Sequence, residues 1–343
     1  MAEEVRDPRE VDWHPRRRTV LYGHDEAESR LLQAHQSGKL HHAWLISGNR
    51  GIGKATLAYR FARFLLHVPD RAKAAAHGSL HVPAEAPVAR LTATGSHPDL
   101  LVIERALDLR NKRLKSEISV DDARKAQGFF ARTAGTGGWR IAIVDSADDL
   151  NSESANALLK VIEEPPERSL FLLVCHQPGR LLRTIRSRSI HLPLDPLDLQ
   201  ATLKTLQSLP PEAVAADAGK LQEAAELSQG SPGKALDLIG SKGAAAYAAF
   251  LKLPRLSPGA CSALGAMFAG REAADDYGVF CDLLNGWIGA KAREQAFAGR
   301  GEALAIAHDE INTSLRQTDA LNLDRRQAVT DALMRLDEAL KAS

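Results

Sequence analysis

A glycine-rich loop is the sequence feature that most limits how this chain can fold. The loop, Gly48-Asn49-Arg50-Gly51-Ile52-Gly53-Lys54-Ala55, follows an apolar run and opens an amphipathic segment. Glycines let successive backbone N–H groups curve around phosphate oxygens, and the lysine offsets the phosphate charge. A helix that starts there adds the positive end of its dipole. The spacing therefore predicts a P-loop between a strand and a helix, although a glycine turn without a ligand has the same local sequence.

Short apolar runs predict a parallel sheet with helices on both faces, and hence an α/β fold. The predicted strands are His42–Ile46, Leu100–Ile103, Arg140–Val144, Leu170–Val174 and Ser189–Leu192. The predicted helices between them are Lys54–Leu66, Ser119–Thr133 and Asn151–Glu164. The stretch 68–96 lacks apolar periodicity, and we interpret it as an insertion or long loop. Past residue 194 no strand-like run follows, and Ala- and Leu-rich helical patterns continue to the end of the chain.

Composition and charge narrow the class of protein. Hydrophobic residues make up 44% of the chain and charged residues 25%, as in soluble globular proteins. The net charge of +1 gives no general attraction to a phosphate backbone, so any contact with nucleic acid is expected to be shared with partners. Cys175, Cys261 and Cys281 form no CxxC pair, so no disulfide framework or thiolate zinc site is predicted. The charged N-terminus and the absence of a long apolar run predict a cytoplasmic protein without membrane contact.

A second nucleotide-site motif follows the third predicted strand. Asp145 stands at the end of that strand, where its carboxylate can face Mg²⁺, although a turn or helix-capping carboxylate is the alternative. The residue after Lys54 should carry a hydroxyl for Mg²⁺, but it is Ala55, and Thr56 comes one position late. Ser146 stands where active ATPases of this kind usually have a glutamate. The sequence therefore predicts a degenerate nucleotide site.

Several longer runs resemble the bacterial AAA+ clamp-loader family, in its delta prime branch, and the resemblance is strongest from Trp139 to Leu194. Three of these runs are Asn151-Ser152-Glu153-Ser154-Ala155-Asn156-Ala157-Leu158-Leu159-Lys160-Val161-Ile162-Glu163-Glu164-Pro165-Pro166, Cys175-His176-Gln177-Pro178 and Thr184-Ile185-Arg186-Ser187-Arg188-Ser189. A fourth, from Asn322 to Val329, resembles the terminal helix of delta prime subunits. The resemblance implies a RecA-like AAA+ domain (1–193), a small helical lid (194–243) and an all-α collar domain for oligomerisation (244–343).

The resemblance also implies roles for particular residues. The family's Ser-Arg-Cys motif, whose arginine reaches into a neighbouring subunit's ATP site, falls on Ser187, Arg188 and Ser189, so Arg188 is the predicted arginine finger. The sensor 1 position falls on His176, and the sensor 2 position falls on Lys234. On spacing alone, a surface arginine is the better interpretation of Arg188, and only the family match favours the finger. Lys234 has a similar alternative, a solvated lysine in the first turn of a helix. The predicted, vestigial nucleotide-binding set is Gly48, Gly51, Gly53, Lys54, Thr56, Asp145, His176 and Lys234.

Cofactor expectations follow from the same comparison with the family. No cofactor is required, and whether the degenerate P-loop holds ATP, ADP or neither stays open. Many family members carry a four-cysteine zinc module after the first helix, but residues 67–97 contain no cysteine here. We expect His67, His77, His81 and His97 to be solvated, and we expect no zinc or other metal site.

The implied function is that of a non-motor subunit in a hetero-pentameric clamp loader with motor and delta subunits. It would help to load the sliding clamp onto primed DNA, with no turnover of its own, within a DNA-directed DNA polymerase holoenzyme at the nucleoid. An ATP-hydrolysing motor subunit is one alternative, but it needs the Mg²⁺ hydroxyl and the carboxylate that Ala55 and Ser146 replace. A P-loop phosphotransferase is another alternative. It would need a pocket for the phosphate acceptor, and it would not need the Ser-Arg-Ser motif. A DNA-binding module is argued against by the net charge.

Overall fold

The computed structural model describes residues 11–108, 113–132, 134, 138–214, 216–297, 301–321 and 323–342. The chain divides into two compact units, one of residues 1–215 with 228–236 and the other of residues 216–227 with 237–343. Thr133 and Asn322, which bound two of the predicted helical segments, lie outside the described residues. The three domain boundaries proposed from the sequence stay a prediction.

A five-stranded sheet forms the centre of the first unit, with strand order β2-β5-β6-β1-β7. Its strands are β1 (Ala43–Ser47), β2 (Leu100–Glu104), β5 (Arg140–Asp145), β6 (Ser169–Cys175) and β7 (Ile190–Pro193). Every neighbouring pair is parallel. All five predicted strands and the predicted parallel sheet are thus confirmed, because continuous apolar runs of strand length are buried on both faces of such a sheet.

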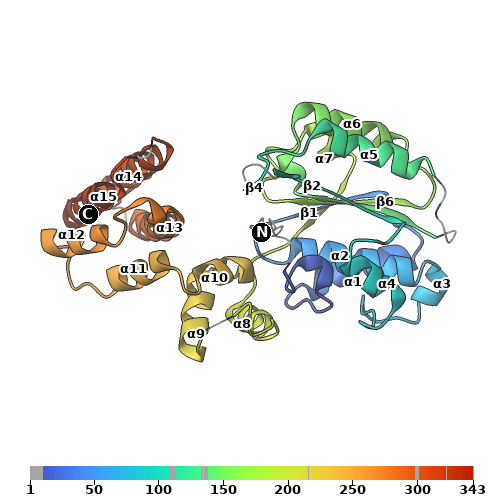
Figure 1. Ribbon diagram of the computed structural model, residues 1–343, viewed down its shortest axis with the longest axis horizontal. Coiled ribbons are helices and arrows are strands. Elements are labelled where there is room, and N and C mark those ends of the chain that lie inside the picture. The colour runs from blue at the N-terminus through green and yellow to red at the C-terminus, as the bar shows by residue number, and fades with distance from the viewer. Residues whose placement is uncertain are drawn as a thin grey trace, which may run out of the picture. The chain divides into compact units, whose positions relative to one another are not determined.

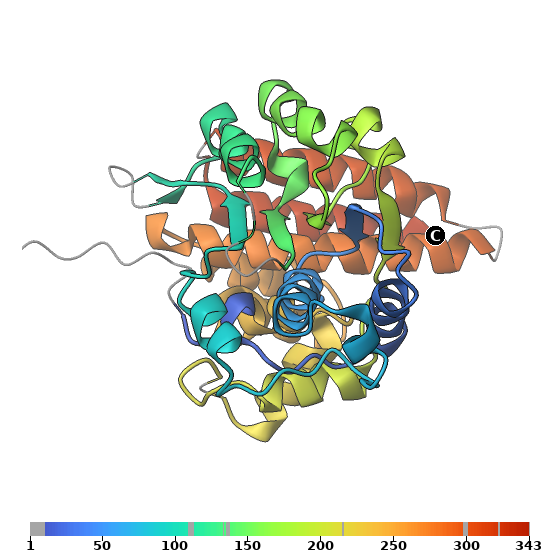
Figure 2. The ribbon, with the colours of Figure 1, turned by 90° about the vertical axis from the view of Figure 1, so that its right-hand side faces the viewer.

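Helices cover both faces of this sheet (Figure 1, Figure 2). One face carries α1 (Asp25–Gln36), α2 (Lys54–His67), α3 (Arg71–Ala74) and α4 (Pro87–Ala93), and the other carries α5 (Val120–Phe130), α6 (Ser152–Glu163) and α7 (Arg183–Ser187). Along β1 the side chains alternate between the two layers. Trp44 and Ile46 pack in the core on the α2 side, and Ala43 and Leu45 pack in the core on the α6 side.

The stretch 68–96 is not the long loop that its sequence predicted. It contains the short helices α3 and α4, and Ala74, Leu80, Val82 and Val88 are buried in the same core as α2. The long-loop interpretation was wrong because elements of four and seven residues are too short to show an apolar period. The other interpretation, an insertion, stays a prediction.

The histidines of this stretch have different surroundings. His67, His77 and His81 are exposed, as predicted. His97 is half-buried, and its Nδ1 accepts a hydrogen bond from the backbone N–H of Asp99, so it is not the solvated side chain that we expected. Among the described residues, no three His, Cys, Asp or Glu side chains come together in a way that could hold a metal ion.

Smaller elements complete the first unit. They are the 3-10 helices η1 (Pro15–Arg17) and η2 (Ala147–Asp149), the antiparallel hairpin β3 (Leu107–Asp108) and β4 (Arg113–Leu114), and α8 (Leu199–Gln207). The helix α10 (Pro232–Leu238) begins in the first unit and ends in the second.

The described part of the second unit is helical throughout. It contains α9 (Ala218–Leu227), α11 (Lys242–Leu251), α12 (Pro258–Ala266), η3 (Arg271–Ala273), α13 (Ala274–Phe297), α14 (Glu302–Ala320) and α15 (Arg325–Ala342). Its core includes Tyr277, Phe280, Ile288, Leu333 and Leu336, all buried. No helix in the described ranges combines the length and the apolar character that crossing a membrane requires.

The contact between α11 and α13 gives a stability prediction for the second unit. A Cβ added at Gly243 would lie 2.1 Å from the backbone oxygen of Asp276, so the Gly243→Ala variant must push the two helices apart. We expect a loss of about 1–3 kcal/mol in the free energy of unfolding. Urea denaturation of the full chain, followed by helix circular dichroism, measures this loss.

Gly278 provides the matched control for that substitution. It lies within α13, and a Cβ there would meet nothing within 4 Å. Gly278→Ala should therefore stabilise the chain by up to about 1 kcal/mol, because alanine has the higher helix propensity. If Gly243→Ala were as stable as Gly278→Ala, the close approach of α11 and α13 would be incorrect.

Candidate functional site

The residues predicted to bind nucleotide gather at the carboxyl edge of the sheet. The loop that begins at Gly48 leaves the end of β1, Asp145 is the last residue of β5, and His176 follows the last residue of β6. The parallel register sets Ser47 opposite Cys175 and Asp145 opposite Val174, so all three segments leave the sheet at one edge. Ligands of open parallel sheets bind at this edge.

The lysine of the P-loop is hydrogen-bonded to carbonyl oxygens of the loop itself. Lys54 is only 3% exposed, and its Nζ donates hydrogen bonds to the carbonyl oxygens of Gly48 (2.7 Å) and Asn49 (2.5 Å). Burial lowers the pKa of Lys54 to about 8, and the charge of Asp145 is the main influence in the opposite direction. A phosphate that binds here must therefore replace hydrogen bonds that the ammonium already makes.

Residues 230–236, the sensor 2 segment that contains the predicted sensor residue Lys234, lie directly on this loop, within the first unit. Ser231 Oγ donates to the carbonyl oxygen of Arg50 (2.8 Å), and the Gly233 N–H donates to that of Gly51 (2.9 Å). Gly51 has φ +80°, and a Cβ there would come within 2.5 Å of Ser231 Oγ. Only glycine therefore permits both the turn and the close approach. Lys234, the predicted sensor residue, is half-buried at the start of α10, and its N–H donates to Ser231 Oγ (3.2 Å).

Beside Asp145, a serine after β5 and a histidine after β6 stand where a hydrolytic site would hold a catalytic carboxylate. Burial raises the pKa of Asp145, and a hydrogen bond from Ser146 Oγ (3.3 Å) opposes that shift. Ser146 Oγ also lies 2.9 Å from His176 Nε2. Burial, followed by the positive charge of Lys54, lowers the pKa of His176 to about 4, so the ring is neutral near pH 7. Neither Ser146 nor the neutral His176 carries the negative charge that a glutamate would have at this position.

Thr56 does not restore the missing magnesium ligand. It lies in α2 two positions after Lys54, and one extra residue turns a side chain by about 100° around a helix. The Thr56 hydroxyl therefore projects from α2 in a different direction from the side chain of the residue directly after the lysine.

Sequence reasoning missed two residues that shape this site. Both carboxylate oxygens of Asp148 accept backbone N–H groups, from His176 (2.9 Å) and Gln177 (3.1 Å), so Asp148 fixes the loop after β6. His24 Nε2 lies 2.7 Å from the carbonyl oxygen of Ile52, which requires a hydrogen on that nitrogen. Asp148 ends the same run as Asp145 but was given no role, and His24 belongs to no motif. Each contact joins segments well separated along the chain.

Arg188 lies away from its own P-loop. It caps the C-terminal end of α7, two residues before β7 begins, and its side chain is 41% exposed. Because β7 runs parallel to β1, its start lies at the amino edge of the sheet. The four residues of β7 place Arg188 about 13 Å or more from the carboxyl edge. The structure therefore does not bring Arg188 together with the other predicted site residues.

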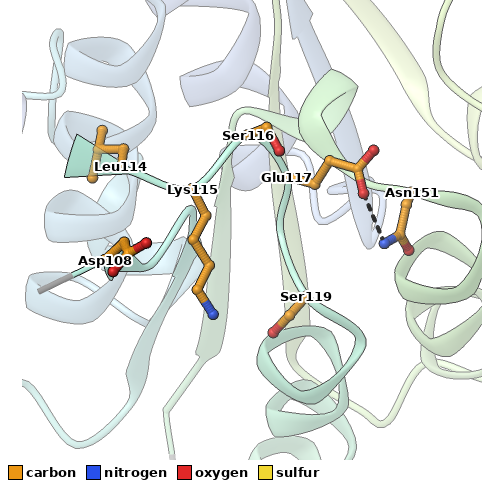
Figure 3. A pocket seen from close by; sticks show the side chains of 7 residues that line it. All are labelled: Asp108, Leu114, Lys115, Ser116, Glu117, Ser119 and Asn151. Carbon is orange, nitrogen blue, oxygen red and sulfur yellow. Dashed lines mark hydrogen bonds between the residues drawn. The ribbon is translucent and has the colours of Figure 1, made fainter. Parts of the chain in front are cut away.

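A polar pocket lies elsewhere in the first unit (Figure 3). It is lined by Asp108, Leu114, Lys115, Ser116, Glu117, Ser119 and Asn151. Asn151 Nδ2 donates to Glu117 Oε2 (3.1 Å) across it. Ser119 and Asn151 are the N-caps of α5 and α6, which accounts for much of the pocket's polar character. It shares no residue with the predicted nucleotide site.

Comparison with known proteins points to one family. The family model described as DNA polymerase III, delta subunit, matches residues 23–198. The DNA polymerase III subunit delta' of Pseudomonas aeruginosa is 38% identical over 56% of this chain and 53% of its own length. The Escherichia coli K12 subunit delta' is 33% identical over 61% and 58%, respectively. The chain thus spans less than two thirds of the length of these curated relatives.

A solved structure supports the fold. The DNA polymerase III gamma subunit-related protein of Thermotoga maritima matches 90% of this chain and 99% of its own, with a TM-score of 0.50 at 16% sequence identity. At this identity the likeness concerns the fold alone. It agrees with the predicted class, a RecA-like AAA+ sheet domain followed by helices.

The neutral state of His176 should make stability depend on pH. The folded pKa of about 4 lies below the ordinary value of 6.5, so between these values the unfolded chain binds a proton that the folded chain does not. The free energy of unfolding should therefore rise with pH across this window, and the rise should be smaller in His176→Gln. Urea denaturation at several pH values measures both slopes. The exposed His81→Gln serves as control, and equal slopes in all three proteins would mean that folded His176 titrates normally.

Proposed function

Because this chain belongs to the DNA polymerase III delta-subunit family, we propose that it is a non-motor subunit of the clamp-loader complex. In this role it helps to load the sliding clamp onto primed DNA and supplies Arg188 to the nucleotide site of a neighbouring ATPase subunit. The family match over residues 23–198 and the similarity to subunits named delta' support the assignment to a loader.

The observation that carries the non-motor role is the state of the degenerate nucleotide site. Ala55 offers no oxygen to Mg²⁺, and Ser146 is hydrogen-bonded to His176 in place of a catalytic carboxylate. The loop lysine and the sensor 2 segment occupy carbonyl oxygens of the P-loop. The glycines and the lysine that remain suit a vestigial site. Such a site would hold ATP or ADP without turnover, or would hold no nucleotide.

The position of Arg188 supports action on a neighbour. It lies at the edge of the sheet opposite to its own P-loop, is partly exposed, and carries a guanidinium whose planar fork suits phosphate oxygens. An exposed arginine that cannot reach the P-loop of its own chain can still contact a nucleotide that is bound to a neighbouring chain. Positive charge at the transferring phosphoryl group stabilises its transition state.

The remaining parts of the proposal concern assembly and place in the cell. The second, helical unit would join motor and delta subunits in a hetero-pentamer, and the complex would act in the bacterial cytoplasm at the nucleoid. No zinc or other cofactor is required. The motor-subunit alternative is disfavoured by Ala55 and Ser146. The phosphotransferase alternative is disfavoured because that class of enzyme needs neither the Ser-Arg-Ser motif nor a long helical tail.

The isolated chain should not hydrolyse ATP in multiple turnovers. Loss of a metal ligand and of the water-orienting carboxylate each typically costs a factor of about a hundred or more in rate. Phosphate release by the purified chain measures this, with Lys54→Ala as the matched control. Steady release that Lys54→Ala abolishes would identify the chain as a motor and contradict the proposal.

Arg188→Ala should lower the clamp- and DNA-stimulated ATPase of the reconstituted loader. An arginine finger in trans is worth about 10³ to 10⁵ in rate in GTPase systems, which is an upper guide here. Because only one interface loses its finger, total ATPase should fall partially, and clamp loading should fall further. Arg188→Lys should also be impaired, since a point charge lacks the planar fork.

Arg183→Ala is the matched control, because Arg183 is exposed on the same short helix. It should leave ATPase and loading unchanged. The thermal stability of either variant should change within about 0.5 kcal/mol. Full activity of a loader shown to contain Arg188→Ala would exclude the finger.

A further inference from the structure

We propose that Glu163 is a positioning residue that holds the Arg188 guanidinium ready for the neighbouring subunit's nucleotide. The inference rests on the proposed trans role of Arg188. Glu163 is the last residue of α6, and its Oε1 lies 3.0 Å from Arg188 Nη2. The salt bridge joins two helices of the first unit, and sequence spacing gave no sign of it.

A second contact fixes the guanidinium from another direction. Arg188 Nη1 donates to the carbonyl oxygen of Thr184 (3.1 Å), one turn earlier along the chain. A guanidinium has five N–H groups, so these two contacts leave three available. A bidentate contact with phosphate oxygens needs two. Arg188 can therefore stay held by Glu163 and Thr184 while it binds a phosphate.

The elements that carry these contacts are locked together in one core. Ile162, next to Glu163, and Ile185, next to Thr184, are both buried among the side chains between the sheet and the α5–α6 layer. The carboxylate and the carbonyl therefore have fixed positions, whereas a free arginine side chain samples many rotamers. Partners that already order the side chain reduce the entropy lost when it engages a phosphate.

The expected effect is modest because the pair is open to solvent. The side chains of Arg188 and Glu163 are 41% and 45% exposed, and ion pairs of this kind are weak. A weak pair restrains the arginine without competing strongly against a polyphosphate. We expect the loss of Glu163 to lower the rate at the neighbouring site by about two- to fivefold, far less than the loss of Arg188 itself.

A double-mutant cycle in the reconstituted loader tests the proposal, with kcat and KM for ATP as readouts. Glu163→Ala should lower the loader's kcat with KM unchanged, because the finger acts in the transition state. The fall should be smaller than that of Arg188→Ala, because the loss of about two- to fivefold affects only one of the loader's sites. Glu163→Gln keeps an acceptor oxygen of the same reach and should recover part of the loss. The neighbouring exposed Glu164→Ala is the matched control and should have no effect. In the Arg188→Ala background, Glu163→Ala should change nothing further.

The outcomes separate this inference from the proposed function. If Arg188→Ala lowers the rate but Glu163→Ala does not, the positioning role is wrong and the finger stands. A rise in kcat with Glu163→Ala would mean that Glu163 restrains Arg188 from its target, which also overturns positioning. An equal fall in both backgrounds would place the effect elsewhere than on Arg188. If Arg188→Ala has no effect, both ideas fail.

Discussion

The pairing of β1 with a parallel neighbour on each side is the constraint on which the functional residues depend. Ser47 lies opposite Cys175 of β6 and Pro193 of β7, so the chain leaves β1 and β6 at the same edge. This places the P-loop beside Asp145 and His176, and it places Arg188, which precedes β7, at the opposite edge. A shift of β1 by one residue would exchange the side chains facing the two helix layers as well as displace the loop.

The polar groups of the predicted nucleotide site satisfy one another. The Lys54 ammonium is nearly buried, and such a charge needs hydrogen-bond acceptors and an opposite charge nearby. It has two loop carbonyls and the charge of Asp145. Asp145, half-buried at the end of β5, is stabilised in its charged form by Lys54, so removal of either residue would take an opposite charge away from the other. Residues in a P-loop pattern can therefore be needed for folding whether or not they bind a nucleotide.

The sequence allowed prediction of features that depend on local pattern, and it failed where distant segments meet. The strands and the helix after Asn151 were predictable because buried strands read as apolar runs, and because Pro165 ends a helix. Short helices within 68–96 have no readable period. The contact of Ser231 with Arg50 spans 181 residues, and no motif encodes it. His176 and Lys234 were placed only through family resemblance, and the part played by Asp148 was not foreseen.

On the proposed function, the two edges of the sheet act as independent half-sites. The P-loop edge would have to supply a metal ligand, a water-orienting carboxylate and a free lysine to catalyse hydrolysis, and each of these is missing or engaged. The opposite edge has to supply only one fixed arginine. The contacts that hold Arg188 come from α6 and α7 and include none of the P-loop residues. Loss of catalysis at one edge therefore leaves the other intact, because the rigid sheet separates the two sets of side chains.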